Sequence, residues 1–580
     1  MKPLSARIPA LKSLSARLGE LVARRRALVA LGAYALVVVW FTWPVLPNVG
    51  ASPVGRVGDQ SIALWDNWWL AKAFSTHASP FYTRHLFYPT GVSLVYHSIS
   101  WLTALVALPL RALFGAVASY NLTFLLETLL CAGSMFALAL YLTKDALAAW
   151  ISGFVFAFDP YRITRAMQHP NLANTGFIPL VFLGLFRAWR DKPRAVWLAA
   201  AALACVLLTG VHLFLMTSVA LLVLVPFEAW QTRRFRDVRF WKTTLYFGLA
   251  CLVLVGPLVV PYVQSRSALG EAMATVTEDW STDLLALIVP APHHAFGAHH
   301  GYRLYGEAGS VAYLGVVALL LAAAVWLMPE TRRAGLVWWT GFALLVVLSL
   351  GPRLTFDARD HDVWMPYRLV ERIPIFRAVR APERLNLLAR VFFAVAVAWG
   401  VVALARLLPK RSLAGLVALP LVLFDYYDGP YPMRPIDQSQ FYNDLAQRGG
   451  TGAILPLPLD RQSSKRAMLA QTIHGRPILG GMVARTPNTA HRYIHGSSLL
   501  RALAANRPLD CRKVTLRDDL ARLKHDNVEF IVVRYPHVNG GLTSAYRSYL
   551  VDQPYFADRH LEAHRIDDLL AARLPCDAPE

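Results

Sequence analysis

Long apolar runs separated by short polar connections dominate the first 426 residues. A helix that crosses a bilayer needs about 20 mainly apolar residues, so the pattern predicts about eleven spans. They fall at 27–46, 119–142, 147–158, 172–190, 195–209, 213–229, 243–264, 310–328, 334–350, 386–408 and 412–426. A further run, 99–114, contains Pro109 and Arg111, and we interpret it as a re-entrant or interfacial helix.

The distribution of basic residues predicts the orientation of these spans. Residues 1–26 form a basic, amphipathic segment ahead of a long apolar run without a small-residue cleavage pattern, which indicates an uncleaved first span and a cytoplasmic N-terminus. With that start, the connections predicted to lie inside carry a clear excess of Lys and Arg, as the positive-inside rule requires. An odd number of spans then places everything after residue 425 outside an inner (plasma) membrane.

Residues 427–580 change in character and predict a soluble, extracytoplasmic α/β domain after the transmembrane domain of 27–426. Segments 453–459 and 528–533 are typical of buried strands, and 516–525 is typical of an amphipathic helix. Cys511 and Cys576 both fall in this domain and can pair in an oxidising compartment, although sequence does not supply their distance.

Composition limits the function classes. The 580 residues carry a net charge of +21, which alone would suggest nucleic-acid binding, but 56% of them are hydrophobic and only 16% charged. The mean hydropathy of +0.39 is that of a multi-span membrane protein, and we expect no nucleic-acid partner. The chain has no Walker loop, no GxGxxG after a strand and no GxSxG elbow, so cytosolic nucleotide chemistry is not supported.

Polar residues concentrate in four loops predicted to lie outside, namely 48–118, 159–171, 265–309 and 351–385. A transporter would instead place polar groups within its spans, which here are almost free of charge apart from Glu127. The distribution therefore predicts a site at the outer membrane surface.

Asp59 in the first outer loop is the leading candidate for chemistry. It precedes a helical pattern with Trp65, Trp68 and Trp69, which suits a helix lying in the headgroup region. Asp59 can serve either as the N-cap of this helix or as a general base for an acceptor hydroxyl. Asp66, on the same helix, is interpreted as a solvated surface residue.

The layout resembles the GT-C superfamily of membrane glycosyltransferases. The shared features are one span, a long outer loop with an early acidic residue, many further spans and an outer α/β domain. The segments YPTG (88–91), FDPYRITRAMQHPN (158–171) and FRAVRAPER (376–384) are similar to uncharacterised bacterial proteins of GT-C type. The resemblance covers essentially the whole chain.

The resemblance implies an inverting, polyprenyl-phosphate-sugar-dependent glycosyltransferase, hexosyl or pentosyl, whose acceptor is an envelope glycan, lipid or protein at the outer face of the inner membrane. Asp59 would be the base. Arginine suits phosphate oxygens, so the implied donor-phosphate residues are Arg162, Arg165, His169, Arg377, Arg380 and Arg384, with Asp159, Glu307 and His299 as further candidates. Snorkelling arginines and paired surface charges remain alternatives for these residues.

Metal dependence and catalytic competence stay open at this point. The third loop holds His293, His294, His299 and His300 near carboxylates, which can bind Zn²⁺ or Mn²⁺, but the spacing matches no known motif. We expect no required cofactor. Many GT-C members have two adjacent acids where this chain has Asp59 followed by Gln60. An envelope lipid or polysaccharide transporter and a non-catalytic assembly protein with a glycan-binding outer domain are therefore the rival functions.

Overall fold

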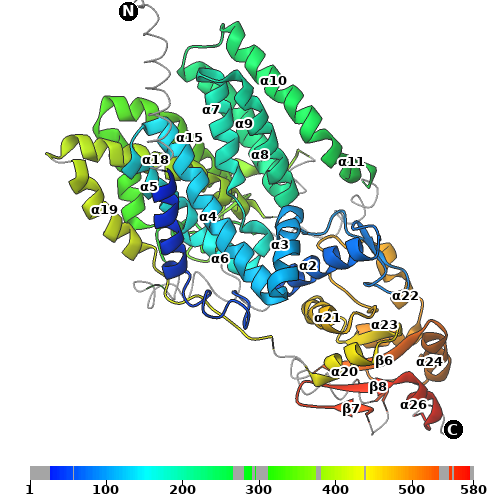
Figure 1. Ribbon diagram of the computed structural model, residues 1–580. Helices are drawn as coiled ribbons and strands as arrows, with labels where there is room; N and C mark the ends of the chain where they lie inside the picture. The colour runs from blue at the N-terminus through cyan, green and yellow to red at the C-terminus, as the bar shows by residue number, and fades with distance from the viewer. Residues whose placement is uncertain are drawn as a thin grey trace, which may run out of the picture.

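The computed structural model describes residues 27–55, 58–265, 280–290, 294, 311–373, 381–409, 411–436, 439–534, 546, 548–550, 554–574 and 576. Figure 1 shows a long bundle of helices with a smaller α/β domain against one end of it. The bundle is formed by residues before 426 and the α/β domain by residues after 439. This division follows the change of character predicted at residue 427.

Apolar helices make up the bundle. They are Ala27–Phe41, α4 (Ala116–Thr143), α5 (Ala146–Ala157), α7 (Phe177–Arg190), α8 (Val196–Thr209), α9 (Val211–Gln231), α10 (Val238–Leu254), α11 (Gly256–Gln264), α14 (Val316–Ala323), α15 (Pro329–Ser349), α18 (Leu385–Leu407) and α19 (Arg411–Asp425). Short 3-10 segments accompany them at η2 (Pro170–Leu172), η3 (Pro193–Ala195), η4 (Leu285–Leu287), η5 (Ala324–Leu327) and η6 (Pro382–Arg384). Each apolar run of the sequence contains at least one of these helices.

Helix α18 is the most buried helix long enough to span a membrane, and it packs against α15, α14 and α5. Its Ala- and Val-rich sequence allows close approach on every side. Gly400 is required at one such contact, because a Cβ atom there would lie 1.7 Å from the carbonyl oxygen of Leu321. The Ser152 hydroxyl of α5 donates to the carbonyl of Ala394 at 2.7 Å and fixes the two helices together.

The number of membrane crossings remains a prediction. Among the described residues, four helical segments are long and apolar enough to cross a membrane, at Ala116–Thr143, Pro170–Arg190, Val211–Gln231 and Pro382–Leu407. The pair α10 and α11, bent by 56°, would make a fifth if it forms one span. The eleven predicted spans and their orientation therefore stay predictions, as does the basic segment 1–26, which lies outside the described residues.

Helix α3 (Trp101–Phe114) occupies the run that sequence interprets as re-entrant or interfacial. Its 14 residues extend about 21 Å, which is shorter than the roughly 30 Å of a hydrocarbon core. Pro109 lies inside it, and Gly115 joins it to α4, against which it packs. The re-entrant or interfacial interpretation of this run stays a prediction.

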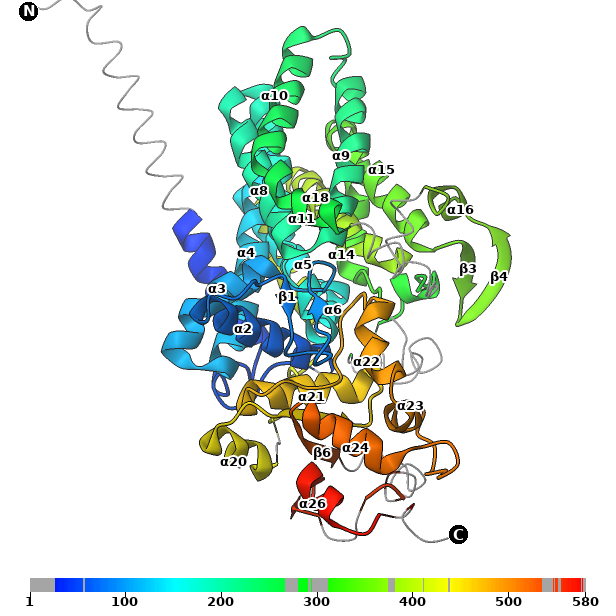
Figure 2. The same ribbon diagram turned by 90° about the vertical axis from the view of Figure 1, so that its right-hand side faces the viewer.

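Helix α2 (Asp59–Ser75) lies between the bundle and the α/β domain, beside α3 and α21 (Figures 1 and 2). The prediction that its tryptophans face lipid headgroups is wrong, because Trp65 and Trp69 are buried at 0% and 3% exposure. The Trp65 indole donates to Gln471 Oε1 of α21 at 2.7 Å. Aromatic residues that suit an interface with lipid suit an interface with protein equally well.

Short elements occupy the loops at this end of the bundle and beside it. They are the antiparallel pair β1 (Tyr82–Thr83) and β2 (Val92–Ser93), the helix α6 (Pro160–Gln168), the hairpin of β3 (Arg353–Phe356) and β4 (Arg359–Trp364), and α16 (Tyr367–Val370). Figure 2 shows the β3–β4 hairpin projecting to one side of the bundle.

The α/β domain contains a sheet of order β5-β6-β8-β7. Its strands are β5 (Ala453–Leu457), β6 (Val528–Arg534), β7 (Phe556–Ala557) and β8 (Leu561–Arg565), and only the β5–β6 pair is parallel. The helices and turns around it are α20 (Gln440–Arg448), α21 (Arg461–His474), η7 (Asn488–His491), α22 (Arg492–His495), α23 (Ser498–Ala504), α24 (Leu516–His525) and α26 (Ile566–Ala571). Both predicted strands and the predicted helix are present.

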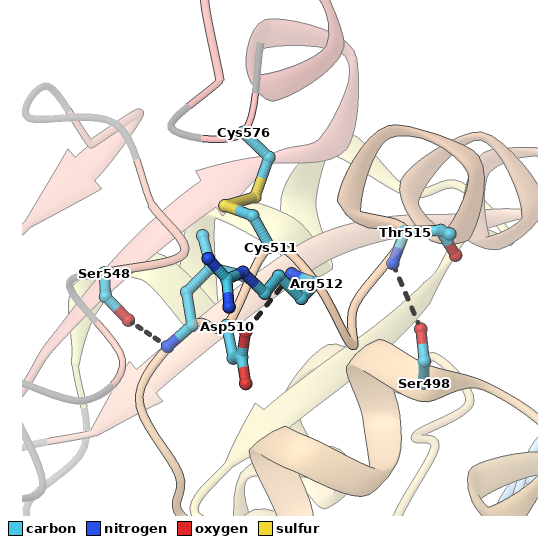
Figure 3. The surroundings of a disulfide bond; sticks show 8 residues. Ser498, Asp510, Cys511, Arg512, Thr515, Ser548 and Cys576 are labelled. Carbon is cyan, nitrogen blue, oxygen red and sulfur yellow. Dashed lines mark hydrogen bonds between the residues drawn. A yellow bond between two sulfur atoms is a disulfide. The ribbon is translucent and has the colours of Figure 1, made fainter. Parts of the chain in front are cut away.

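A disulfide joins Cys511 to Cys576, with a Cα–Cα distance of 5.5 Å. It ties the segment before α24 to the end of the chain after α26 (Figure 3). The pairing that sequence left open is therefore formed in this structure. Disulfides of this kind persist in oxidising compartments, in keeping with the predicted extracytoplasmic position of the domain.

Candidate functional site

Asp59 is the first residue of α2, and its carboxylate connects three distant parts of the chain. Oδ2 lies 2.5 Å from Nδ1 of His169, and Oδ1 lies 2.7 Å from Nζ of Lys465 on α21. No side-chain hydrogen bond caps α2, whose N-cap position is held by Gly58. The carboxylate is thus not used as a helix cap but as the meeting point of the first loop, the second loop and the α/β domain.

The surroundings of Asp59 favour its ionised form. Burial alone would raise its pKa, but the hydrogen bonds and charges of His169 and Lys465 outweigh burial and hold the pKa well below the usual range. The side chain is 20% exposed, while those of His169 and Lys465 are 33% and 14% exposed. The carboxylate therefore carries its negative charge at neutral pH and remains partly open to solvent.

Helix α6 places His169 opposite Asp59. Asp159 caps this helix by accepting from the backbone N–H of Arg162 at 3.1 Å, and Pro160 follows at the first helical position. The other Asp159 oxygen lies 2.9 Å from Nε of Arg390 on α18, with both side chains 1% exposed. Asp159 is held as a structural anchor between α6 and α18. His169, directly after α6, receives its position from this anchor.

The two arginines of α6 are buried rather than open. Arg165 pairs with Glu383 at 2.6 Å, and both side chains are less than 5% exposed. Arg162 donates to the carbonyl of Ala157 at 2.6 Å, while its Nε and Nη2 atoms are buried without a hydrogen-bond partner among the described residues. Neither arginine presents its guanidinium to solvent, and within the described residues Arg162 retains unused donor capacity.

Arg384 is the cation best placed for a ligand. It follows Glu383 at the start of α18, it is partly exposed, and it interacts electrostatically with Asp59. Within the described part of the chain its guanidinium makes no hydrogen bond or ion pair. His212, at the start of α9, interacts electrostatically with both Arg384 and His169, and its Nε2 atom is buried without a described partner.

A small cavity of about 40 Å³ lies beside α2, one to two helical turns from Asp59. It is lined by Asp66, Thr103 and Glu127 among other residues, and its volume suits about three water molecules rather than a sugar ring. Glu127 accepts from the Thr103 hydroxyl and from Asn174 Nδ2.

The interpretation of Asp66 as a solvated residue is wrong. Its side chain is 7% exposed and lies 3.2 Å from Nε2 of His97, whose Nδ1 accepts from the backbone N–H of Ala484. Burial raises the pKa of Asp66, and the charge of His97 opposes that rise. Nδ1 is engaged by the backbone N–H of Ala484, so Nε2 is the ring atom that faces Asp66. The pair joins α2 to the α/β domain.

Several residues singled out by sequence fall outside the described part of the chain. These are Arg377, Arg380, His299 and Glu307, together with His293 and His300. His294 is described and lies 2.9 Å from the carbonyl oxygen of Asp425, near α19. Within the described residues no group of three or more His, Cys, Asp or Glu side chains could hold a metal ion.

Lys465 is the site residue that sequence reasoning missed. It stands in the segment RQSSKR at the start of α21, where charged and polar residues are typical of a solvated surface. No local signal separates it from its neighbours, because its partner Asp59 is 406 positions away. Only the docking of α21 on α2 brings the two together.

Residues 29–428 match the family described as "Domain of unknown function (DUF6311)", and the chain belongs to this family. No curated protein matches the sequence. The fold is similar to arabinofuranosyltransferase AftD from Mycobacteria, with 16% identity, a TM-score of 0.53 and coverage of 94% of this chain. This chain spans only 41% of the length of AftD.

ArnT from Cupriavidus metallidurans matches over nearly its full length. In the form bound to undecaprenyl phosphate it shares 15% identity with this chain and has a TM-score of 0.51, covering 95% of this chain and 99% of ArnT. The apo form gives the same TM-score at 12% identity. AftD and ArnT are GT-C membrane glycosyltransferases, so the GT-C fold predicted from sequence is confirmed.

Proposed function

We propose that this DUF6311 protein is a membrane glycosyltransferase that transfers a sugar from a polyprenyl-phosphate donor to an envelope glycan, lipid or protein. One observation carries the proposal. In a GT-C fold, an ionised and partly exposed carboxylate, Asp59, sits where the first loop, the second loop and the α/β domain meet. Arg384, whose guanidinium has no ion pair among the described residues, interacts with it electrostatically.

The proposed reaction is an inverting displacement. The acceptor hydroxyl oxygen attacks the anomeric carbon, Asp59 takes the hydroxyl proton, and the bond from the anomeric carbon to the phosphate oxygen breaks. The electron pair of that bond leaves with polyprenyl phosphate. Arg384 lies where it would stabilise the charge on the leaving phosphate, and Arg377 and Arg380 precede it in the same segment.

Three further residues would act from behind Asp59 and Arg384, namely His169, Arg162 and Arg165. The imidazole of His169 fixes the orientation of Asp59 through the contact of 2.5 Å. The guanidinium group of Arg162 would supply buried positive charge near the proposed phosphate position, and Arg165, whose charge is balanced by Glu383, would hold this part of α6 in place. The donor-phosphate site is thus proposed to combine one open arginine with two buried ones.

Lys465 defines a resting arrangement of the site. Its ammonium group forms an ion pair with Oδ1 of Asp59, while His169 contacts Oδ2. A carboxylate with both oxygens engaged in this way is a weak proton acceptor. We propose that the acceptor hydroxyl replaces this ammonium, which raises the pKa of Asp59 at the moment the base is needed. The charge of Lys465 is then free to approach the leaving phosphate.

Several features support a lipid-linked donor at the outer face. ArnT, which shares the fold over nearly its whole length, is known in a form bound to undecaprenyl phosphate. The disulfide between Cys511 and Cys576 suits an extracytoplasmic α/β domain. We therefore propose the inner membrane as the location, with the α/β domain outside, and an acceptor that approaches from that side.

Asp59→Asn in a reconstituted transfer assay tests the proposal. The protein is placed in proteoliposomes with a panel of radiolabelled polyprenyl-phosphate pentoses and hexoses and an envelope extract as acceptor, with and without chelator. We expect the wild type to transfer label, the variant to lose about 10²–10⁴ in rate, and the chelator to have no effect. Asp362→Asn is the matched control, because that carboxylate is 94% exposed and pairs with Arg368 at the surface. Wild-type turnover by a folded Asp59→Asn protein would remove Asp59 from the role of base.

A non-catalytic assembly protein is the second candidate. Two observations favour it. Both oxygens of Asp59 already have partners. Gln60 is buried, and its side-chain amide donates to the carbonyl of Val54 at 3.0 Å, which is a structural contact. This candidate predicts that the protein binds an envelope glycan without releasing polyprenyl phosphate from any donor in the panel. Release of polyprenyl phosphate that depends on Asp59 would exclude it.

A further inference from the structure

A large cavity lies at the end of the bundle remote from Asp59. Its volume is about 1150 Å³, and its walls come from the ends of α7 and α9, the turn from α9 to α10, and the first turns of α15. Figures 1 and 2 place the connection between α9 and α10 at the opposite end of the molecule from the α/β domain. The cavity is therefore separate from the proposed site of sugar transfer.

Positive charge without local neutralisation lines this cavity. Four arginines and two glutamates contribute to the walls, but Glu228 is paired with Arg190 at 3.4 Å and Glu330 is paired with Arg406, which stands outside the lining. The remaining three arginines have no acidic partner among the described residues, namely Arg233, Arg236 and Arg333. The planar guanidinium group of an arginine can donate two hydrogen bonds at once to the oxygens of a phosphate group.

The walls also offer apolar contact and an unused hydrogen-bond donor. Trp230 and Phe235 stand at the opening with more than half of their surface exposed, whereas Trp338 is buried at 2%. The indole N–H of Trp399, which lines the cavity, is buried without an acceptor in the described part of the chain. An acceptor oxygen placed in the cavity would satisfy this donor.

Exposed leucines lie along α9 and α10, the two helices joined by the turn that lines the cavity. Leu222 on α9 is 76% exposed, and Leu245 and Leu252 on α10 are 61% and 69% exposed. Exposed leucines along helices of this kind face hydrocarbon, and aromatic residues such as Trp230 mark the boundary with the headgroups. A molecule that enters the cavity at this boundary would carry an anionic head and apolar chains.

We propose that this cavity binds the phosphate headgroup of an anionic phospholipid, with its acyl chains lying along α9 and α10. Arg233, Arg236 and Arg333 contact the phosphate, and Trp399 donates to a headgroup oxygen. Basic pockets between membrane helices are the kind of site that selects anionic from zwitterionic lipids. The site goes beyond the proposed transfer reaction and does not depend on it.

The test measures lipid binding by the full-length protein in detergent. Bound phospholipid is counted by native mass spectrometry while dioleoyl phosphatidylglycerol or dioleoyl phosphatidylcholine is titrated. We expect the wild type to bind phosphatidylglycerol at least tenfold more tightly than phosphatidylcholine. The triple variant Arg233→Gln, Arg236→Gln, Arg333→Gln should lose that preference.

The matched control removes the same charge from the same end of the bundle. Arg194, Arg239 and Arg332 are exposed and do not line the cavity, so the triple Gln variant of these residues should keep the preference within twofold. Trp399→Phe, which removes the indole N–H while keeping an aromatic ring at this position, should weaken phosphatidylglycerol binding several-fold and serves as the test if the first triple variant does not fold.

Two arms identify the source of the phosphate. Inorganic phosphate and glycerol 3-phosphate at millimolar concentration should not displace the lipid, because they lack acyl chains. Displacement by either would assign the cavity to a soluble phosphate and overturn the lipid proposal. Equal loss of preference in the control triple variant, or equal binding of the two lipids by the wild type, would also overturn it.

Discussion

Removing the disulfide between Cys511 and Cys576 should destabilise the α/β domain without affecting the bundle. The bond closes a loop of 65 residues that includes α24 and β6. The chain-entropy relation for a loop of this length gives about 4 kcal/mol at 25 °C. A domain of this size has a total free energy of unfolding of about 5–15 kcal/mol, so the loss is a large fraction of it.

Pulse proteolysis of the full-length protein in urea measures this loss. A brief protease pulse cleaves the α/β domain only when it is unfolded, and the bundle fragment is resolved separately on a gel. We expect Cys511→Ala with Cys576→Ala to lower the free energy of unfolding of the domain by about 2–4 kcal/mol, since engineered losses often fall below the entropic value. Cys251→Ala is the matched control, because Cys251 is a free cysteine in α10.

Reduction provides an independent check. The wild type in dithiothreitol should unfold at the urea concentration of the double variant, and the double variant should not respond to dithiothreitol. A change below about 1 kcal/mol would refute the reasoning. It would mean either that the denatured domain remains compact or that the bond is not formed in the native protein.

Three further predictions concern the contacts of Asp59 and α2. Lys465→Met removes an opposite charge that lies 2.7 Å from Asp59, so the pKa of Asp59 should rise. The base then becomes protonated at a higher pH, and the acid limb of the pH–rate profile should shift to higher pH than in the wild type. His169→Gln keeps a hydrogen bond to Asp59 and should lower the rate about tenfold, whereas a loss as large as that of Asp59→Asn would make His169 the base. Gln471→Ala leaves the buried indole N–H of Trp65 without its acceptor and should weaken docking of the α/β domain by about 1–3 kcal/mol. The weaker docking would be measured as faster hydrogen exchange in α21, and Gln462→Ala, at an exposed position, is the control.

The helices and the α/β character of residues 427–580 were predictable because they depend on local periodicity. The segment 516–525 forms a helix with those same bounds, and 453–459 and 528–533 contain parallel strands. Apolar runs of about 20 residues have few alternatives to a helix. The GT-C fold followed from the order of these elements.

The partners of Asp59 were not predictable to the same degree. His169 was singled out because it lies in a polar loop on the expected face, but its contact with Asp59 depends on how α6 packs against α18. Lys465 gave no signal at all. The burial of Trp65 and Asp66 shows the same limit, because an aromatic and charged helix can face lipid, water or another domain with equal local plausibility.

The α/β domain contributes to the Asp59 site as well as being attached to the membrane part. Lys465 contacts the carboxylate, Gln471 fixes the helix that carries it, and the backbone of Ala484 positions His97 against Asp66. A site completed by contacts from two domains is sensitive to their relative position, because a shift of about 1 Å is enough to misalign a base. An acceptor that binds to the α/β domain and moves it slightly would change the distance from Lys465 to Asp59 and with it the pKa of Asp59. In the proposed reaction, acceptor binding and activation of the base would then be one event, which gives a reason for Lys465 to stand on the α/β domain.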